Sequence, residues 1–283
     1  MKDYIALTKP RVTWLIVMST AVGYYFGLRG PLDVMTLLHT LLGTGLLASG
    51  TFTLNQWLER EADAKMRRTR NRPLPAGRIR PARAFWFGVA LSAAGFLELG
   101  LGANWLAGFL GAGTLLAYLL LYTPLKRRSW HSTSVGALPG AMPPVIGFAG
   151  ACGALTVEAW LLFGILLLWQ FPHFYSIAWL YREDYARAGI RMLPVVEPDG
   201  RSTARQILIA SLLLIPASLL PVAFSMAARW YMIAALLLGL GFLHAGWRLA
   251  SGRTPAQARA VLMASVVYLP LLYGFLLLAR PGR

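Results

Sequence analysis

Long apolar runs separated by short polar segments follow one another along almost the whole chain. They predict helices near residues 12–28, 34–57, 84–102, 104–121, 133–153, 158–181, 206–227, 230–247 and 260–278. Each run approaches or exceeds the ~20 residues that cross ~30 Å of hydrocarbon, and none alternates strictly as a lipid-facing barrel strand does. The pattern therefore predicts an all-α polytopic membrane protein with about nine transmembrane helices.

The composition agrees with a chain whose main solvent is lipid. Hydrophobic residues make up 57% of the sequence and charged residues 13%, whereas a soluble domain carries roughly 25% charged residues. The single cysteine, Cys152, excludes an intramolecular disulfide and a cysteine-based metal cluster. The first apolar run is long for a signal peptide, so we expect a retained first helix. With no break in composition, we expect residues 1–283 to form one integral-membrane domain.

The net charge of +16 would suggest a nucleic-acid partner in a soluble protein, but its distribution favours another explanation. With the N-terminus inside, the inner segments are the N-terminus, 58–83, 122–132, 182–205 and 248–259. These segments hold 23 of the 27 Lys and Arg residues. This asymmetry is typical of the positive-inside rule and predicts a cytoplasmic N-terminus and no nucleic-acid partner. Binding of an anionic substrate or lipid is a second possible use of the charge.

Two long hydrophilic loops, residues 58–83 and 182–205, follow a similar order of residue types. Each opens with acidic residues, becomes basic and reaches a Leu-Pro pair. Both leave the membrane on the same side, so we expect them to face one another over a common site. Residues 135–153 form a helix rich in Gly and Pro, which indicates either tight helix packing or a bend that shapes a cavity.

Three oxygen-bearing side chains repeat with helical spacing where the second helix meets the first of these loops. Asn55, Glu59 and Asp63 lie at i, i+4 and i+8, so a continuing helix presents them on one face. Hard oxygen donors of this kind suit Mg²⁺, which binds through carboxylates, waters and substrate phosphates. Glu61 points elsewhere and is expected to pair with a nearby arginine in solvent.

A basic and polar stretch follows directly, made of Lys65, Arg67, Arg68, Arg70, Asn71 and Arg72. An acidic face beside such a stretch fits a metal-bridged diphosphate, with the metal between carboxylates and phosphate and the cations on the remaining oxygens. The alternative is a salt-bridged cytoplasmic loop that only obeys the positive-inside rule. The polar positions begin inside the helix, at Asn55, which favours the binding site.

The pattern N-x-x-x-[D/E]-x-x-x-D at a cytoplasmic helix end, in a chain with nine predicted helices, resembles the UbiA superfamily of intramembrane prenyltransferases. The strings "DAKMRRTRNRPLPAGRI" and "WQFPHFYSIAWLYREDYARAGIRMLPVV" are similar to its protoheme IX farnesyltransferase (haem O synthase) subfamily. The resemblance covers about residues 4–196. It implies helices arranged around a central cavity and farnesyl transfer from farnesyl diphosphate to a vinyl group of haem B, with Mg²⁺ as cofactor.

The resemblance also implies a second acidic position after the sixth helix. Superfamily members commonly carry D-x-x-x-D there, whereas this chain has only the adjacent Glu183 and Asp184. Asp184 is carried over as a catalytic and metal-binding residue with Asn55, Glu59 and Asp63, and Glu183 as a second-site candidate. Aromatic faces for the allylic cation are offered by Trp57, Phe171, Phe174, Tyr175 and Trp179.

Further candidates for the haem or a second site are His173, Lys126 and Arg127. A membrane histidine such as His173 suggests function, as an iron ligand, a propionate partner or a proton acceptor, although a packing histidine is the default. Lys126 and Arg127 lie where they could meet propionate or diphosphate, but topology alone explains them. Lys9 and Arg11 carry the same ambiguity.

The expected partners are farnesyl diphosphate, haem B and the lipid bilayer, with haem-modifying or oxidase-assembly proteins as further possibilities. The resemblance places the chain in a bacterial plasma (inner) membrane with its active site facing the cytoplasm. Two alternatives stay open: another UbiA-type enzyme that acts on a quinone precursor or a chlorophyllide, and a membrane transporter. A transporter is expected to place polar residues at mid-membrane in several helices, whereas this chain concentrates its acids at one face. A haem-binding assembly factor would not need the acidic face.

Overall fold

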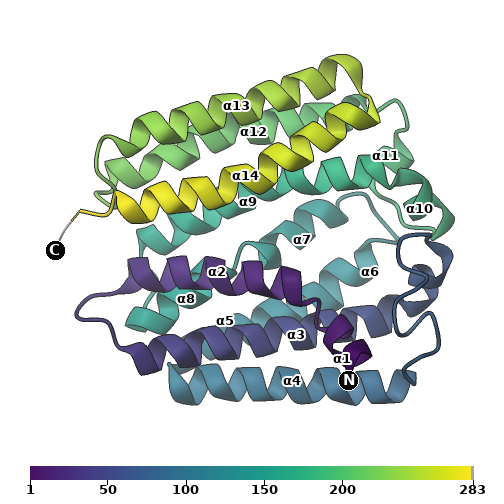
Figure 1. Cartoon of the computed structure of the whole chain (residues 1–283), viewed down its shortest axis with the longest axis horizontal. Coiled ribbons are helices and arrows are strands. Elements are labelled where there is room, and N and C mark those ends of the chain that lie inside the picture. The colour runs from purple at the N-terminus through teal and green to yellow at the C-terminus, as the bar shows by residue number, and fades with distance from the viewer. Residues whose placement is uncertain (282–283) are drawn as a thin grey trace.

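Eight helical segments in this computed structural model, which describes residues 1–281, are long and apolar enough to cross a membrane. They are α3 (Val34–Lys65), α4 (Pro81–Gly102), Trp105–Leu125, Ser132–Cys152, α9 (Val157–Leu180), α12 (Arg201–Ala223), α13 (Tyr231–Gly252) and α14 (Pro255–Leu278). The remaining predicted helix, the first of the nine along the chain, is α2 (Pro10–Gly27), an 18-residue helix that lies in the same bundle (Figure 1). Since residues 1–281 contain no strand, the predicted all-α membrane fold is confirmed.

Two of the spans are interrupted. The span Trp105–Leu125 consists of α5 (Trp105–Leu116), the π-helical segment η1 (Ala117–Tyr122) and the short α6 (Thr123–Leu125). The span Ser132–Cys152 is divided into α7 (Ser132–Gly140) and α8 (Pro143–Cys152), which begins at two consecutive prolines. Because proline has no backbone N–H to donate to the preceding turn, the helix is interrupted where the prolines lie.

Close packing accompanies this bend. A Cβ atom added to Gly147 of α8 would lie 1.9 Å from the backbone oxygen of Thr20 in α2, so the two backbones are in contact there. The predicted tight packing of the Gly- and Pro-rich helix is therefore confirmed, whereas a cavity shaped by its bend stays a prediction. Glycine allows this approach because it has no side chain. Such close packing is important in lipid, where little hydrophobic drive holds helices together.

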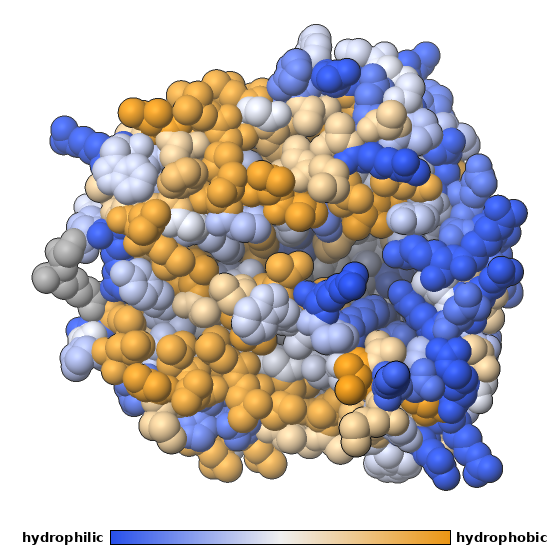
Figure 2. Space-filling model, in the orientation of Figure 1, coloured by the Kyte–Doolittle hydropathy of each residue, from blue (hydrophilic) through white to orange (hydrophobic). Residues whose placement is uncertain are grey.

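One end of the bundle is hydrophilic. The short helices α1 (Lys2–Leu7), α10 (Arg182–Arg187) and α11 (Leu193–Val196) lie there together with the loop that follows α3 (Figure 1). Figure 2 shows hydrophilic side chains gathered over this end and hydrophobic ones over the body of the bundle. α3 continues about two turns beyond its predicted end at residue 57, so Glu59 and Asp63 are helical and the first loop is shorter than expected.

The body of the bundle turns apolar side chains outward. Leu101 is 74% exposed and Leu278 is 77% exposed, as expected of side chains whose neighbours are lipid tails. The largest buried core joins α9, α12, α13 and α14 around residues such as Phe242, Tyr268 and Leu214. The chain is thus an integral membrane protein whose polar residues concentrate at one end.

Candidate active site

The end of α3 at the hydrophilic end presents the predicted acidic face. Asn55 and Asp63 are each 1% exposed, whereas the side chain of Glu61 is 74% exposed and pairs with Arg60 at 3.6 Å. The helical spacing therefore separates a buried face from a solvated one, as predicted. What surrounds the buried face comes from other segments of the chain.

Glu59 is bound by Lys126, which follows α6. Lys126 Nζ donates a hydrogen bond to Glu59 Oε1 at 2.8 Å, and both side chains are largely buried. Burial alone would lower the pKa of the Lys126 ammonium, but the Glu59 carboxylate outweighs it and holds that pKa well above its usual value. Lys126 is therefore a fixed cation beside the acidic face.

Asp63 is bound by Arg72 of the loop that follows α3. Arg72 Nη1 lies 2.7 Å from Asp63 Oδ2, with the carboxylate buried and the guanidinium partly exposed. Thr69 Oγ1 donates to the backbone oxygen of Asp63 at 2.9 Å, which returns the loop toward the end of α3. The predicted basic stretch thus supplies one cation, Arg72, directly to the acidic face.

A third cation comes from the N-terminus. Lys9 lies between α1 and α2 with a left-handed backbone (φ 48°), and its ammonium nitrogen lies 4.9 Å from the centre of the Phe52 ring. Burial, followed by the nearby charges of Arg72 and Lys126, lowers the pKa of Lys9 to about 7. Lys9, Arg72 and Lys126 therefore bring three basic groups to two carboxylates, and this excess can receive an anion.

Aromatic rings of α3 and η1 lie next to the charged groups of the site. Tyr118 and Tyr122 contact each other edge to face at 4.9 Å, and Tyr118 meets Phe52 at 6.3 Å. The Lys126 ammonium lies 4.4 Å above the Tyr122 ring. Tyr122 also borders a hollow that is lined by Thr133, Gly136, Phe174, Ile177, Ala178, Tyr185 and Met192. The charged groups thus adjoin a largely apolar recess.

Asp184 joins the two hydrophilic loops. Its carboxylate oxygens accept hydrogen bonds from the backbone N–H groups of Arg67 and Arg68, both at 3.2 Å, and it also pairs with Arg187. Arg68 lies over the Tyr181 ring at 4.7 Å. The two loops therefore contact one another, and their sharing of a common site stays a prediction. Glu183, by contrast, is exposed.

The remaining predicted diphosphate-binding side chains lie outward. Among them, Lys65, Arg67, Arg70 and Asn71 are exposed, as is the second-site candidate Arg127. Asn71 contributes its backbone oxygen to Arg78 at 2.9 Å. Their part in diphosphate binding stays a prediction.

His173 belongs to another helix pair. Its Nδ1 lies 2.8 Å from Ser265 Oγ of α14, and its ring stacks on Trp169 at 4.7 Å. These contacts fit a hydrogen-bonded packing histidine between α9 and α14. A role toward haem stays a prediction.

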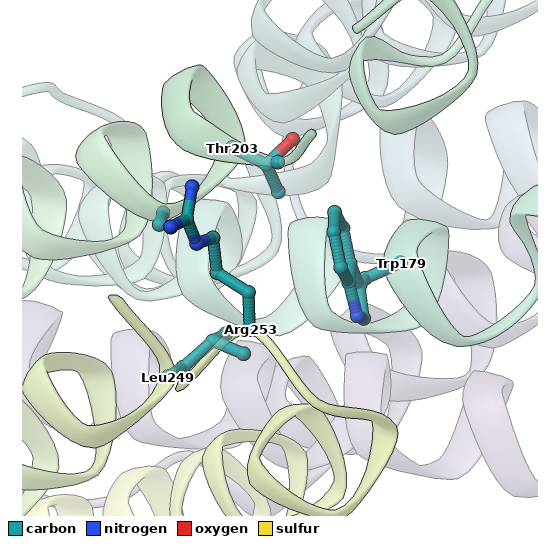
Figure 3. Close-up of a pocket in the computed structure, with 6 residues that line it drawn as sticks. Trp179, Thr203, Leu249 and Arg253 are labelled. Carbon is teal, nitrogen blue, oxygen red and sulfur yellow. The ribbon is translucent and has the colours of Figure 1, made fainter. Parts of the chain in front are cut away.

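Three of the five aromatic residues expected near the cation lie in different places. Phe174 lines the hollow beside Tyr122, whereas Trp57 packs against Phe85 at 4.9 Å. Trp179 borders a separate hollow between α9, α12 and α13, where Figure 3 shows it with Thr203, Leu249 and Arg253. Within residues 1–281, Trp179 is the one predicted residue that lines this second hollow, and none of the predicted acidic, basic or histidine residues does.

The acidic face of α3 offers ligands that suit Mg²⁺. Within residues 1–281 no three His, Cys, Asp or Glu side chains group closely enough to hold a metal ion, so Asp184 is not joined to Glu59 and Asp63. The α3 face offers two carboxylates and the Asn55 amide, all hard oxygen donors. This set fits Mg²⁺, which takes one or two carboxylates and completes its shell with water and substrate phosphates. Asp184 as a metal ligand stays a prediction.

Tyr118, Tyr122 and Thr123 were not identified from the sequence, and Lys9 was left ambiguous. One signal was present, since Tyr118, Tyr122 and Lys126 are spaced at i, i+4 and i+8 like the acidic residues of α3. Two such stripes on neighbouring helices indicate faces that meet.

Comparison with known proteins adds a family context. A model of the UbiA prenyltransferase family matches residues 16–270. The chain is 63% identical to a protein named protoheme IX farnesyltransferase from Solibacter usitatus (strain Ellin6076), over the full length of both. It is 48% identical to one of the same name from Koribacter versatilis (strain Ellin345), over 99% of this chain and 94% of that protein.

Two solved structures share the fold. A digeranylgeranylglyceryl phosphate synthase structure has a TM-score of 0.82 at 17% identity, covering 98% of this chain and 97% of that one. A UbiA homologue from Archaeoglobus fulgidus, bound to DMAPP and Mg²⁺, has a TM-score of 0.69 at 18% identity, covering 97% and 99%.

Proposed function

This chain belongs to the UbiA prenyltransferase family, and from that membership we propose that it transfers the farnesyl group of farnesyl diphosphate to a vinyl group of haem B. A relative named protoheme IX farnesyltransferase matches it at 63% identity over both full lengths, which supports this donor and acceptor. The product is haem O, whose side chain carries the added farnesyl group and a hydroxyl group from water.

One observation in the site carries the proposal. Glu59 and Asp63 occupy one face of α3, and each is bound by a cation from a different segment, Lys126 at 2.8 Å and Arg72 at 2.7 Å. A leaving diphosphate and its Mg²⁺ need basic and acidic side chains within a few ångströms of each other. Buried ionisable groups in a membrane protein are costly and mark functional sites, and this cluster offers both signs of charge to a metal–diphosphate.

We assign the donor site to this cluster. Mg²⁺, held by Asn55, Glu59 and Asp63, would neutralise charge on the leaving diphosphate. Lys9, Arg72 and Lys126 bind diphosphate oxygens that the metal leaves free, and their positive charge stabilises the group as it departs. Lys9 comes from the N-terminal segment, whereas Arg72 and Lys126 come from later segments, so basic side chains reach the diphosphate from two sides.

The acceptor reaction requires a dry space next to these charges. The C1–O bond of farnesyl diphosphate breaks, and the haem vinyl group gives its electron pair to C1. Water adds to the resulting cation and loses a proton, which forms the hydroxyl group. The faces of Phe52, Tyr118 and Tyr122 stabilise the allylic cation, and the apolar hollow beside Tyr122 excludes water until the new carbon bond has formed.

We further place the hydrophilic end of the bundle at the cytoplasmic face of a bacterial plasma membrane. The excess of Lys and Arg in the segments at that end supports this orientation. Farnesyl chains stay in the bilayer and haem is amphipathic, so both can reach a site at the membrane surface.

The decisive experiment supplies the purified full-length protein, in lipid nanodiscs, with haem B, farnesyl diphosphate and Mg²⁺. Mass spectrometry is expected to detect haem O, and chelation of Mg²⁺ is expected to prevent its formation. Absence of haem O, with prenylated 4-hydroxybenzoate formed when that acceptor is supplied, would overturn the haem assignment while keeping prenyl transfer.

A further inference from the structure

The π-helical segment η1 ends at a threonine that touches the acidic face. The backbone N–H of Thr123 bonds the Tyr118 oxygen five residues earlier, as a π-helical turn requires. The Thr123 hydroxyl donates to the same Tyr118 oxygen at 2.9 Å. π-helical turns cost stability and are found frequently at functional sites, so the position of Thr123 calls for a reason beyond helix formation.

This hydroxyl has a second partner across the helix interface. Asn55 Nδ2 lies 3.1 Å from Thr123 Oγ1, in a buried contact between residues 68 positions apart. A hydroxyl has one proton and two acceptor sites. Because that proton is committed to the Tyr118 oxygen, the hydroxyl acts only as an acceptor toward Asn55.

The orientation of the Asn55 amide follows from this. Its nitrogen must face Thr123, since the amide oxygen would otherwise meet the lone pairs of a hydroxyl that has no proton to give. The same side chain hydrogen-bonds the Glu59 carboxylate, so Thr123 and Glu59 together set the orientation of the amide. Asn55 is 1% exposed and Thr123 is 7% exposed, so water does not compete easily for either group.

We propose that Thr123 is a positioning residue that fixes the Asn55 amide, which also hydrogen-bonds Glu59, on the face of Glu59 and Asp63 that would bind a divalent cation. This inference rests on the proposed function, because it assumes that the acidic face binds a metal–diphosphate. Partners that orient a metal ligand commonly change metal affinity by 10–100-fold when they are removed. The π-helical turn brings Thr123 to the place where this orientation is set.

The test compares Thr123→Val, which has nearly the same shape and no hydroxyl, with Thr123→Ser, which keeps it. Thr114→Val is the matched control, because the Thr114 hydroxyl bonds only the Leu110 oxygen on its own helix, at 2.7 Å. Mn²⁺ replaces Mg²⁺ as the probe, and its binding to the full-length protein with farnesyl diphosphate, without haem, is followed by electron paramagnetic resonance.

Thr123→Val is expected to weaken Mn²⁺ binding about 10-fold or more, while Thr123→Ser and Thr114→Val stay within about twofold of the unchanged protein. Thr123→Ala is measured alongside, so that a folding defect of the valine variant does not decide the result. Mn²⁺ affinity within twofold in a folded valine or alanine variant would overturn the role of Thr123. A parallel assay in which the unchanged protein makes no haem O would instead overturn the proposed function.

Discussion

The ammonium nitrogen of Lys126 lies 2.8 Å from Oε1 of Glu59 and joins two segments that are 67 residues apart. The pair connects the end of α3 with the segment that follows α6, at the point where the acidic face meets the aromatic rings. Buried ion pairs of this kind are costly to break, because the remaining charge stays buried without a partner. The relationship therefore links the stability of this end of the bundle to the proposed site.

Removal of the cation alone should destabilise the protein. Lys126→Met is expected to lower the free energy of unfolding by ~3 kcal/mol, since Glu59 is left buried and unpaired. Arg127→Met, at the exposed neighbouring position, is expected to change it by less than ~0.5 kcal/mol. Unfolding in detergent, followed by circular dichroism, measures both. The double variant Glu59→Gln with Lys126→Met should recover much of the loss. Equal stability of Lys126→Met and Arg127→Met would contradict the pairing.

The two faces of the α3 end should differ in their effect on activity. Asp63→Asn is expected to reduce the rate of haem O formation by ~100-fold or more, because a buried carboxylate of the site is lost. Glu61→Gln makes the matching change on the solvated face, where the side chain is 74% exposed, and is expected to stay near the unchanged rate. Initial rates at saturating Mg²⁺ decide between them. Similar rates for both variants would remove Asp63 from the site.

Asp184 and Glu183 are adjacent but should not be equivalent. Asp184→Asn weakens the charge-assisted bonds to the backbone N–H groups of Arg67 and Arg68, each worth about 1.5–3 kcal/mol. Hydrogen exchange at these two amides is expected to accelerate by ~10-fold or more, together with lower activity. Glu183→Gln, at an exposed position, should leave both unchanged. An effect of Glu183 equal to that of Asp184 would count against this assignment.

Lys9 should give the reaction a pH dependence near neutrality. Its pKa is lowered to about 7 by burial and by neighbouring cations, so the ammonium loses its proton as the pH rises through this value. Since kcat/KM reports the free enzyme, kcat/KM for farnesyl diphosphate is expected to fall above pH 7. Lys9→Arg should remove the fall because the guanidinium stays charged, and Lys65→Met, at an exposed position, should keep it. An unchanged pH profile in Lys9→Arg would exclude Lys9 as its source.

Contact between the backbones of α2 and α8 predicts an asymmetric response to alanine. Gly147→Ala would place its Cβ 1.9 Å from the Thr20 oxygen, and we expect ~1–3 kcal/mol of destabilisation from the forced shift. Gly164 in α9 has open space around its Cβ position, so Gly164→Ala is expected to be neutral or stabilising by up to ~1 kcal/mol. Thermal unfolding of the two variants measures the difference, and equal melting temperatures would contradict the close packing.

The helical spans, the gathering of charged residues at one end of the bundle and the acidic face of α3 could all be predicted from the sequence alone. These features depend on local rules: apolar length, the 3.6-residue period and the distribution of Lys and Arg. Asn55, Glu59 and Asp63 needed only a continuing helix to share one face. The family resemblance added the expected chemistry and drew attention to Asp184.

Which charged residues meet depends instead on how the distant segments of the chain pack together. Lys126 and Arg72 reach Glu59 and Asp63, whereas Lys65, Arg70 and Arg127 of the same basic segments remain exposed. The π-helical turn that places Tyr118, Tyr122 and Thr123, and the approach of Lys9 from the N-terminus, depend on contacts between distant segments. The helical period does not encode such contacts, because helix packing and loop closure decide which of the many Lys and Arg side chains reaches the acidic face.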